Sequence, residues 1–542
     1  MRRAGGRRPA RNRPVPARGA GTGHRSRPAQ PRSPVILVSR RSRQRDRLGW
    51  VGRPAIGFPA LRVLPYLCPT TGGHRDRLGP NGSPHPHARF RAVHRVRPAH
   101  RAGGPLYGVR PAEAFRPPPR HPTHAVDRAF LDLERRRPEV RWDAGGVAYL
   151  SGPPPSLADL RAYVAFRLGE LPLLTSRVTG GRRPGWQPSE DFPVDRHVYE
   201  VVADGPADWD TALHSALNAP FAPGAYWGVW LIHGHEPDAY ALCYRFLHAC
   251  QDGSAAAMTF RAMLGDGEPS ARPLPGGSGV FGVPRRFGAA VALATRFLAR
   301  TFTVRGHRPD PAFAPAGERR LWRGRVPVDT LRLIGAGRGG SAHDAHLAAL
   351  AGALSVWAAR SGVPLPRVTA VLPVDARRAD EEQTWGNRCF ALPVDLPVGP
   401  APGRPHGSPD EEAPLRRLDQ IMAVTRKLRG DTWRQAVQDL VRYMPDRPTA
   451  WYLRRMLSPR VTNVMATSMP LAEKGSLGET RVTGTALLPL LVPGHLCGVG
   501  LSFFGDWAEV SFVADRALPL GELLPELWEQ GVRELAESVQ RG

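Results

Sequence analysis

The feature that most constrains this chain is a His-x-x-x-Asp-Gly motif that lies between two different apolar patterns. Residues 240–247 (YALCYRFL) form a short apolar run typical of a buried strand, and residues 254–264 (SAAAMTFRAML) have the composition of a helix. His248 and Asp252 are therefore predicted at a strand-to-helix corner, where side chains tend to face a cleft. Gly253 allows the chain to turn there because it has no side chain to intrude.

Two interpretations of the motif follow from its residues. An imidazole that is neutral near pH 7 can take a proton from an alcohol, while an acid four positions later shapes the backbone beside it. Alternatively, His248 is a core histidine followed by an ordinary Asp-Gly turn. Because so loose a pattern also arises by chance, the choice depends on the rest of the chain.

The positive charge of the chain is concentrated at its N-terminal end. Residues 1–124 hold 27 arginines, no lysine and three acidic residues, so the rest is nearly neutral although the net charge is +27. This Arg/Pro/Gly-rich segment has little apolar periodicity, and we expect it to be disordered. It is either an electrostatic arm for nucleic acid or anionic lipid, or GC-rich upstream coding sequence read as protein, which we favour. The apolar run at residues 34–39 is too short for a secretory signal.

The cysteines and the apolar runs indicate a cytoplasmic protein. No run approaches the roughly 20 apolar residues that span a bilayer. The five cysteines lack the paired spacing of a disulfide framework or a zinc site: Cys68, Cys243, Cys250, Cys389 and Cys497. Cys250 lies inside the motif, where we interpret it as a small buried residue rather than a thiol nucleophile.

Strands and helices alternate along the remaining chain. The predicted strands cover residues 226–232, 240–247, 321–327, 368–373, 390–396, 498–504 and 507–512, with a turn at 235–238. The predicted helices cover residues 157–168, 212–222, 254–264, 342–360 (after Ser341 as N-cap), 415–428 and the chain from 520. Residues 266–283, 306–317 and 398–413 are predicted loops. The basic amphipathic stretch 285–305 is a helix packed between two domains or, alternatively, a membrane-surface helix.

From residue 125 onward, an ordered series of blocks resembles the bacterial wax ester synthase/diacylglycerol acyltransferase family. The blocks are DRAFLDLE at 127–134, GPPPSLADLR and LPLLTSR within 152–177, DFPVDRHV at 191–198, FAPGAYWGVWLIHG at 221–234, the motif itself, VLPVDAR at 371–377, Gly-Asn at 386–387 and VTNVMATSMP at 461–470. The resemblance implies an α/β fold of two chloramphenicol acetyltransferase-like domains, with mixed sheets flanked by helices and an active-site channel between the domains. It places the N-terminal domain at 125–283, a connector at 284–317 and the C-terminal domain at 318–542.

The same resemblance implies roles for particular residues. His248 is expected to be the catalytic base. Asp252 is expected to be structural, with Gly253 beside it and Arg377 as its partner; the alternative for Arg377 is a solvated loop residue. The resemblance also assigns Asn387, Asn463 and Trp227 to substrate binding, although Gly-Asn alone is also typical of a turn. The family shows Asn-Asp where this chain has His343-Asp344, which we interpret as helix capping.

The predicted activity is transfer of a long-chain acyl group from acyl-CoA, as substrate, to diacylglycerol or a long-chain alcohol, without a cofactor or metal. Neither a Gly-x-Ser-x-Gly elbow nor a Walker-type phosphate-binding loop is present, which favours direct transfer. The family's first motif histidine is Leu247 here, and its Pro-Leu-Trp reads Ala225-Tyr226-Trp227. These departures support an alternative, a condensation-type enzyme acting on carrier-bound acyl groups. Peripheral contact with membranes or lipid inclusions is expected. Nucleic-acid binding is not, because the basic N-terminal segment lacks interleaved aromatic residues for base stacking.

Overall fold

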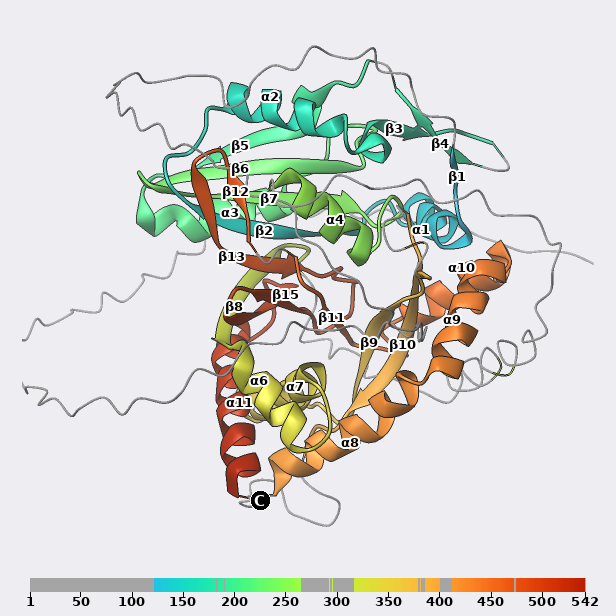
Figure 1. The fold of residues 1–542 in the computed structure, drawn as a ribbon, viewed down its shortest axis with the longest axis vertical. Helices are drawn as coiled ribbons and strands as arrows, with labels where there is room; N and C mark the ends of the chain where they lie inside the picture. Colours follow the sequence, from blue (N-terminus) through green and yellow to red (C-terminus); the bar gives the residue numbers. More distant parts are fainter. Residues whose placement is uncertain are drawn as a thin grey trace, which may run out of the picture. The chain divides into compact units, whose positions relative to one another are not determined.

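A computed structural model describes residues 121–181, 184–189, 191–264, 316–378, 386–399, 412–471 and 474–541, together with positions 292, 295 and 381. These residues belong to one compact unit, Pro98–Gly542. Predictions for residues 1–120, for nearly all of the 265–315 segment and for 400–411 lie outside the described residues. Below, "N-terminal half" means residues 121–264 and "C-terminal half" means residues 316–541 (Figure 1).

The first large sheet is mixed and has the strand order β12-β13-β2-β7-β6-β5. Its strands are β2 (Asp143–Ser151), β5 (Val198–Val202), β6 (Trp227–Glu236), β7 (Ala239–Leu247), β12 (Ser476–Leu477) and β13 (Thr480–Leu488). Only β5 and β6 run parallel, and the other neighbours are antiparallel. Helices α2 (Leu157–Leu168) and α4 (Gly253–Met263) pack on one face, and α3 (Trp209–Asn218) packs on the other.

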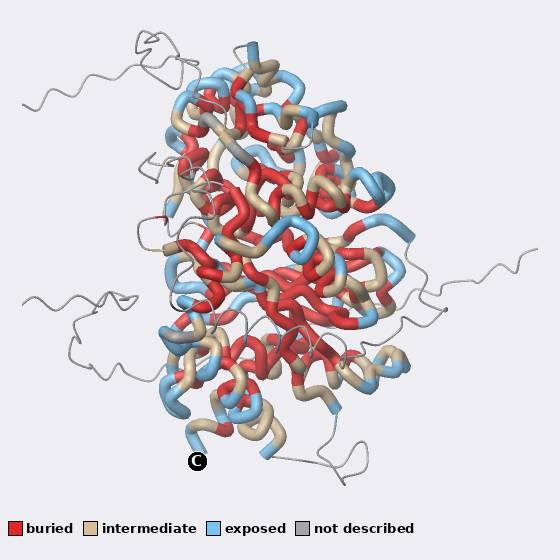
Figure 2. The backbone as a smooth tube through the Cα atoms, turned by 90° about the vertical axis from the view of Figure 1, so that its right-hand side faces the viewer, coloured by how far each residue is buried: buried red, intermediate tan, exposed pale blue. Residues whose placement is uncertain are grey.

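The second large sheet belongs entirely to the C-terminal half and has the order β10-β9-β11-β14-β15-β8. Its strands are β8 (Arg319–Pro327), β9 (Val368–Asp375), β10 (Cys389–Leu396), β11 (Val464–Ser468), β14 (Cys497–Phe504) and β15 (Trp507–Asp515). Its helices are α6 (Val328–Gly337), α7 (Ala342–Ser361), α8 (Ala413–Leu428), α9 (Asp431–Tyr443), α10 (Asp446–Met456) and α11 (Leu524–Arg541). Figure 2 shows that the buried residues gather in the middle of the molecule, whereas exposed residues lie mostly at its edges.

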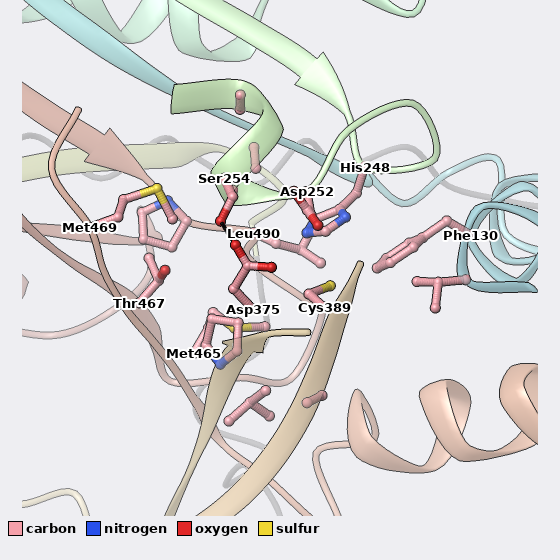
Figure 3. A pocket seen from close by; sticks show the side chains of 18 of the residues that line it. Phe130, His248, Asp252, Ser254, Asp375, Cys389, Met465, Thr467, Met469 and Leu490 are labelled. Carbon is pink, nitrogen blue, oxygen red and sulfur yellow. Dashed lines mark hydrogen bonds between the residues drawn. The ribbon is translucent and has the colours of Figure 1, made fainter. Parts of the chain in front are cut away.

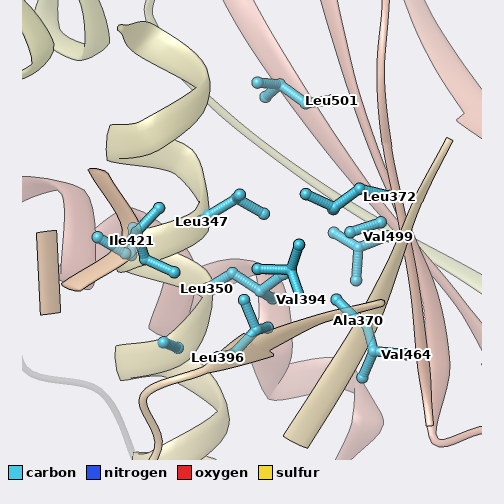
Figure 4. Close-up of a cluster of buried hydrophobic side chains, with 14 of the residues drawn as sticks. Leu347, Leu350, Ala370, Leu372, Val394, Leu396, Ile421, Val464, Val499 and Leu501 are labelled. Carbon is cyan, nitrogen blue, oxygen red and sulfur yellow. The ribbon is translucent and has the colours of Figure 1, made fainter. Parts of the chain in front are cut away.

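Helix α7 forms the centre of this half because it is apolar on nearly every side, as is typical of a buried helix. Its Leu347 and Leu350 pack among strand residues such as Leu372 and Val499 (Figure 4). Ser341 caps the helix through a hydrogen bond from the Asp344 N–H, as its sequence predicted. The remaining elements are helix α1 (Ala125–Arg136) and a small sheet of β1 (His121–Pro122), β4 (Gly185–Pro188) and β3 (Ser176–Val178).

One hairpin crosses between the halves. Strands β12 and β13 come from the C-terminal half, yet β13 pairs with β2 and completes the first sheet. The domain boundary predicted at residue 318 does not account for this exchange. Because backbone hydrogen bonds join the halves, they are held as one body around the space between them.

Most predicted elements form, and their differences from the prediction have local causes. Helix α3 starts three residues earlier than expected and ends at Asn218, because Ala219 precedes Pro220 and adopts an extended conformation. The C-terminal helix begins at Leu524 rather than near residue 520, since Leu520 has a positive φ of 53° and a short 3₁₀ turn follows it. Strand β6 continues through His235 and Glu236, which were predicted as turn.

Helices α1, α6, α9 and α10 were not predicted. Among the described residues, none of the helices combines the length and apolar character needed to cross a bilayer.

Candidate active site

An apolar cavity of about 200 Å³ lies between the two halves and contains the motif histidine in its wall. The N-terminal half contributes residues from α1, β2, β7 and α4, and the C-terminal half contributes residues from β9, β10, α10, β11 and β13. Most of the lining is aliphatic or aromatic. Polar side chains gather near His248, and Figure 3 shows Asp252, Ser254, Asp375 and Thr467 around the same space.

His248 directly follows β7, and its position is set by backbone pairing and by an aromatic contact. Its N–H donates to the Trp142 carbonyl at 2.9 Å, which continues the pairing of β7 with β2. Its ring stacks on Phe130 of α1, with ring centroids 4.2 Å apart and an angle of 16° between the planes. The half-buried ring faces the cavity, as the strand-to-helix corner predicted, and is not enclosed in the core.

The surroundings keep this imidazole neutral. Burial lowers the pKa of His248 below its usual value, and the nearby Asp252 charge and hydrogen bonds from the ring to its own backbone and to Asn387 only partly oppose that shift. A neutral imidazole has one nitrogen with a free lone pair, so His248 has the protonation state that a general base requires at neutral pH.

Asp252 joins the halves instead of facing the substrate space with free oxygens. It accepts two hydrogen bonds from Arg377, each 2.9 Å long, and both side chains are only 2% exposed. It also caps α4 by accepting the Ala255 N–H at 3.0 Å, and it accepts the Arg388 N–H at 2.7 Å. Burial raises the pKa of Asp252, but the Arg377 charge and these hydrogen bonds outweigh it and lower the pKa overall. The predicted Asp252–Arg377 contact thus forms, and Asp252 is a structural anchor at this corner.

Two glycines permit the close packing around this anchor. A Cβ on Gly253 would overlap the terminal methyl group of Met469, which also lines the cavity. Gly386 has a φ of +88°, which a residue with a side chain rarely adopts, and its carbonyl accepts a hydrogen bond of 2.9 Å from Arg377. The glycine therefore turns the chain so that Asn387 enters the site from the C-terminal half.

The three residues predicted to bind substrate lie in different places. Asn387 is fully buried and contacts His248, with Nδ1 of the ring 3.2 Å from its Oδ1. Asn463 is not part of the cavity wall, and its amide bonds to the backbone N–H of Thr369 and the carbonyl of Arg367. Trp227 is also outside that wall, and its Nε1 donates to the Leu174 carbonyl at 2.8 Å. Only Asn387 is brought to the histidine, and it does not line the cavity either.

Several cavity residues were missed by the sequence reasoning. Ser254 donates to Asp375 at 2.6 Å, which links the start of α4 to the end of β9 beside the cavity. Both are neighbours of predicted residues, one following the Asp-Gly pair and the other inside the VLPVDAR block, and this adjacency was the available signal. Phe130 lies in the DRAFLDLE block, where nothing marks it as a partner of His248.

The thiols and carboxylates give no support for other chemistries within the described residues. Cys389 lines the cavity, but burial raises the pKa of its thiol well above the usual value, which disfavours the nucleophilic thiolate. Burial likewise raises the pKa of Cys250. Within the described ranges, no group of three or more His, Cys, Asp or Glu side chains is arranged to hold a metal ion.

Comparison with known proteins agrees with this geometry. No model of a protein family matches the chain. Two provisionally named diacylglycerol O-acyltransferases from Mycobacterium tuberculosis, one from strain CDC 1551/Oshkosh and one from strain ATCC 25618/H37Rv, are each 25% identical to it over 403 residues, which is 65% of this chain and 78% of theirs.

Solved structures share the fold at lower identity. A wax ester synthase/diacylglycerol acyltransferase from Marinobacter aquaeolei VT8 matches with a TM-score of 0.52 at 18% identity, covering 78% of this chain and all of that one. The first condensation domain of the calcium-dependent antibiotic synthetase matches with a TM-score of 0.53 at 16% identity, covering 78% and 97%. The predicted fold class is confirmed.

The chain therefore has a chloramphenicol acetyltransferase-like fold, with a histidine in the wall of a cavity between its halves. The sequence matches make it more particular. The chain resembles the wax ester synthase/diacylglycerol acyltransferase family, as the sequence blocks indicated, and is an O-acyltransferase.

Proposed function

We propose that this O-acyltransferase moves a long-chain acyl group from acyl-CoA to the hydroxyl group of diacylglycerol or a long-chain alcohol. The observation that carries the proposal is His248, an imidazole held neutral by burial, in the wall of an apolar cavity reached by residues from both halves. The M. tuberculosis relatives, named for diacylglycerol, support the acceptor class.

The cavity lining suits an acyl chain. Beyond the polar residues near His248, its wall consists mainly of aliphatic and aromatic side chains, and Leu453, Leu487 and Leu490 are among them. Each methylene transferred from water to such a surface contributes about 0.8 kcal/mol of binding free energy. The same lining excludes water, which would otherwise compete with the alcohol as acyl acceptor.

The reaction proceeds by direct transfer. His248 takes the proton of the acceptor hydroxyl while its oxygen forms a bond to the thioester carbonyl carbon. The carbon–sulfur bond then breaks, and the proton passes from the imidazolium to the departing thiolate. The products are an ester and free CoA, and no resident cofactor takes part.

The start of α4 supplies donors for the negative charge on the carbonyl oxygen. Gly253 and Ser254 line the cavity and belong to the first turn of α4. N–H groups in a first helical turn have no acceptor within the helix, and the helix dipole adds positive potential there. These groups are therefore our candidates for stabilising the oxyanion.

A second candidate function has specific support. The condensation-domain neighbour has the same fold, and Leu247 replaces the first histidine of the family motif. A condensation-type enzyme would use the same base but accept acyl groups bound to a carrier protein. For either substrate class we place the reaction in the cytoplasm; Cys243, Cys250, Cys389 and Cys497 are all free thiols, which suits a reducing compartment. For lipid acceptors, we expect contact with a membrane or lipid-inclusion surface.

The substrate assignment is tested with the purified full-length chain. Palmitoyl-CoA is incubated alone, with dioleoylglycerol, with hexadecanol, or with a hydrophilic alcohol as the matched control, and released CoA thiol and ester product are both measured. We expect thiol release only with the two lipid acceptors, in equal amounts to the ester formed. If no lipid acceptor supports release while a palmitoylated carrier protein does donate its acyl group, the condensation-type function is correct instead.

A further inference from the structure

The amide of Asn387 has only one orientation that satisfies its neighbours. Its Nδ2 lies 2.8 Å from a carboxylate oxygen of Asp127 and 2.8 Å from the His248 carbonyl oxygen. The carbonyl oxygen can only accept a hydrogen bond, and the Asp127 carboxylate also accepts the backbone N–H groups of His124 and Asn387. A flipped amide would place its oxygen against two acceptors inside a buried site, which is strongly unfavourable.

This orientation determines which ring nitrogen of His248 carries the proton. Because Nδ2 faces Asp127, the amide oxygen Oδ1 faces Nδ1 of His248 at 3.2 Å. An amide oxygen only accepts, so Nδ1 must be the donor and must carry the hydrogen. In a neutral imidazole the other nitrogen, Nε2, then has the free lone pair.

Asp127 is built to hold the amide in this way. It lies on α1 and is 1% exposed, and it is 260 positions away from Asn387 in the chain. It accepts the backbone N–H of Asn387 at 3.0 Å and that of His124 at 2.7 Å, in addition to the Asn387 side chain. Burial raises the pKa of Asp127 above its usual value, and these three donors, which favour the ionised form, oppose that rise only in part.

We propose that Asp127 is a positioning residue that fixes the proton of His248 on Nδ1 through Asn387 and so leaves Nε2 as the base. The role in catalysis rests on the proposed function, whereas the placement of the proton does not. Helix α1 thereby positions His248 through two of its residues: Asp127 acts through Asn387, and Phe130 stacks directly on the ring.

A purely structural role for Asp127 is the competing explanation. Its carboxylate also bonds the N–H of His124, the residue before α1, and this contact by itself stabilises the start of the helix. Loss of stability alone therefore cannot distinguish the two roles. The location of the imidazole proton can, because capping α1 does not depend on it.

The direct test is ¹⁵N NMR of the full-length chain with ¹⁵N-labelled histidine. The chain has 18 histidines, and the His248 signals are identified by their loss in His248→Gln. In the wild type we expect a protonated Nδ1 and an unprotonated Nε2. In Asp127→Ala the two tautomers should mix, and Asp127→Asn, which retains one acceptor oxygen, should fall between them. Unchanged proton placement in both folded variants would overturn the proposal.

Kinetics supply the second readout. For Asp127→Ala we expect kcat to fall about tenfold to a hundredfold, as for the loss of a hydrogen bond to a charged group, with little change in KM. Asp127→Asn should recover part of the loss. The matched control is Asp132→Ala on the same helix, because within the described part of the chain Asp132 pairs only with surface arginines, including Arg136 at 2.6 Å and Arg454 at 3.1 Å. This variant should leave kcat unchanged. A wild-type chain without acyl transfer would refute the proposed function, while the NMR result would still decide the placement of the proton.

Discussion

The ion pair between Asp252 and Arg377 should couple the two halves strongly, and a double-mutant cycle measures that coupling. Arg377→Met keeps much of the side-chain length but removes both 2.9 Å bonds to Asp252, the 2.9 Å bond to the Gly386 carbonyl and the 3.1 Å bond to Asp375. It leaves a buried carboxylate without its counter-charge. Such a change costs about 3–5 kcal/mol.

The structure favours the lower end of that range, about 3 kcal/mol. Asp252 keeps two backbone donors, the N–H groups of Ala255 and Arg388, after Arg377 is replaced. The double variant Asp252→Asn/Arg377→Met contains no unpaired buried charge, so its loss should be smaller than the sum of the single losses. We expect a coupling free energy of about 2 kcal/mol, within the range seen for contacting pairs.

Urea unfolding followed by tryptophan fluorescence measures these free energies. The pH dependence of the unfolding free energy provides a second test, because the direction of the pKa shift of Asp252 predicts its sign. In the wild type, the lowered pKa of Asp252 contributes stability above the pKa of an unfolded aspartate, about 3.9, and this stability is lost as the pH falls through the lower folded value. In Arg377→Met, burial raises the pKa of Asp252 without the opposing arginine charge. The loss of unfolding free energy relative to wild type should therefore be greater at pH 8 than at pH 5. The control Arg434→Met removes an exposed pair with Asp431 and should change stability by less than about 0.5 kcal/mol. Single losses that add to the double loss within about 0.5 kcal/mol would refute the coupling.

Three further outcomes are expected. Because burial lowers the pKa of His248, kcat/KM should stay level from pH 8 down to about 6.5, the usual histidine value, and an inflection above that pH would contradict the assignment. Burial and the Asp143 charge raise the pKa of Glu134 to about 7, and its Oε1 has no partner among the described residues. Ionised Glu134 therefore costs stability as the pH rises, and urea unfolding should find Glu134→Gln more stable than wild type by up to about 3 kcal/mol at pH 8 but not at pH 4. Gly386→Ala should destabilise the chain by about 1–2 kcal/mol because Gly386 has a positive φ. Activity should fall further than this loss of stability explains, because Asn387 moves, and activity equal to that of the wild type would argue against the link between Gly386 and Asn387.

The parts of the site that sequence predicted are those encoded by neighbouring residues. The change from a strand pattern to a helix pattern at residues 247–253 placed His248 at a corner, and the structure has β7 ending at Leu247 and α4 beginning at Gly253. The apolar periodicity also located α2 and α7. Family resemblance, rather than periodicity, supplied Arg377 as the partner of Asp252.

The parts that sequence did not predict depend on contacts between distant positions. Asn387 reaches His248 and Asp127 across 139 and 260 positions, and no local pattern indicates such a pairing. The exchange of β13 into the first sheet is also non-local, because β13 pairs with β2 more than 300 positions away. Asn463 was predicted to bind substrate, but its side-chain amide hydrogen-bonds to the backbone of residues 367–369 instead. The geometry of the sheet, rather than a local sequence pattern, determines these partners.

The most direct measurement of the central claim is steady-state acyl transfer by full-length His248→Gln beside wild type. Glutamine keeps a polar side chain at the corner but has no nitrogen able to accept a proton, so kcat should fall about 10²- to 10⁴-fold while urea unfolding stays close to wild type. Cys389→Ala, at another position in the cavity wall, should retain kcat. A folded His248→Gln chain that keeps more than a tenth of wild-type kcat would show that another group removes the alcohol proton.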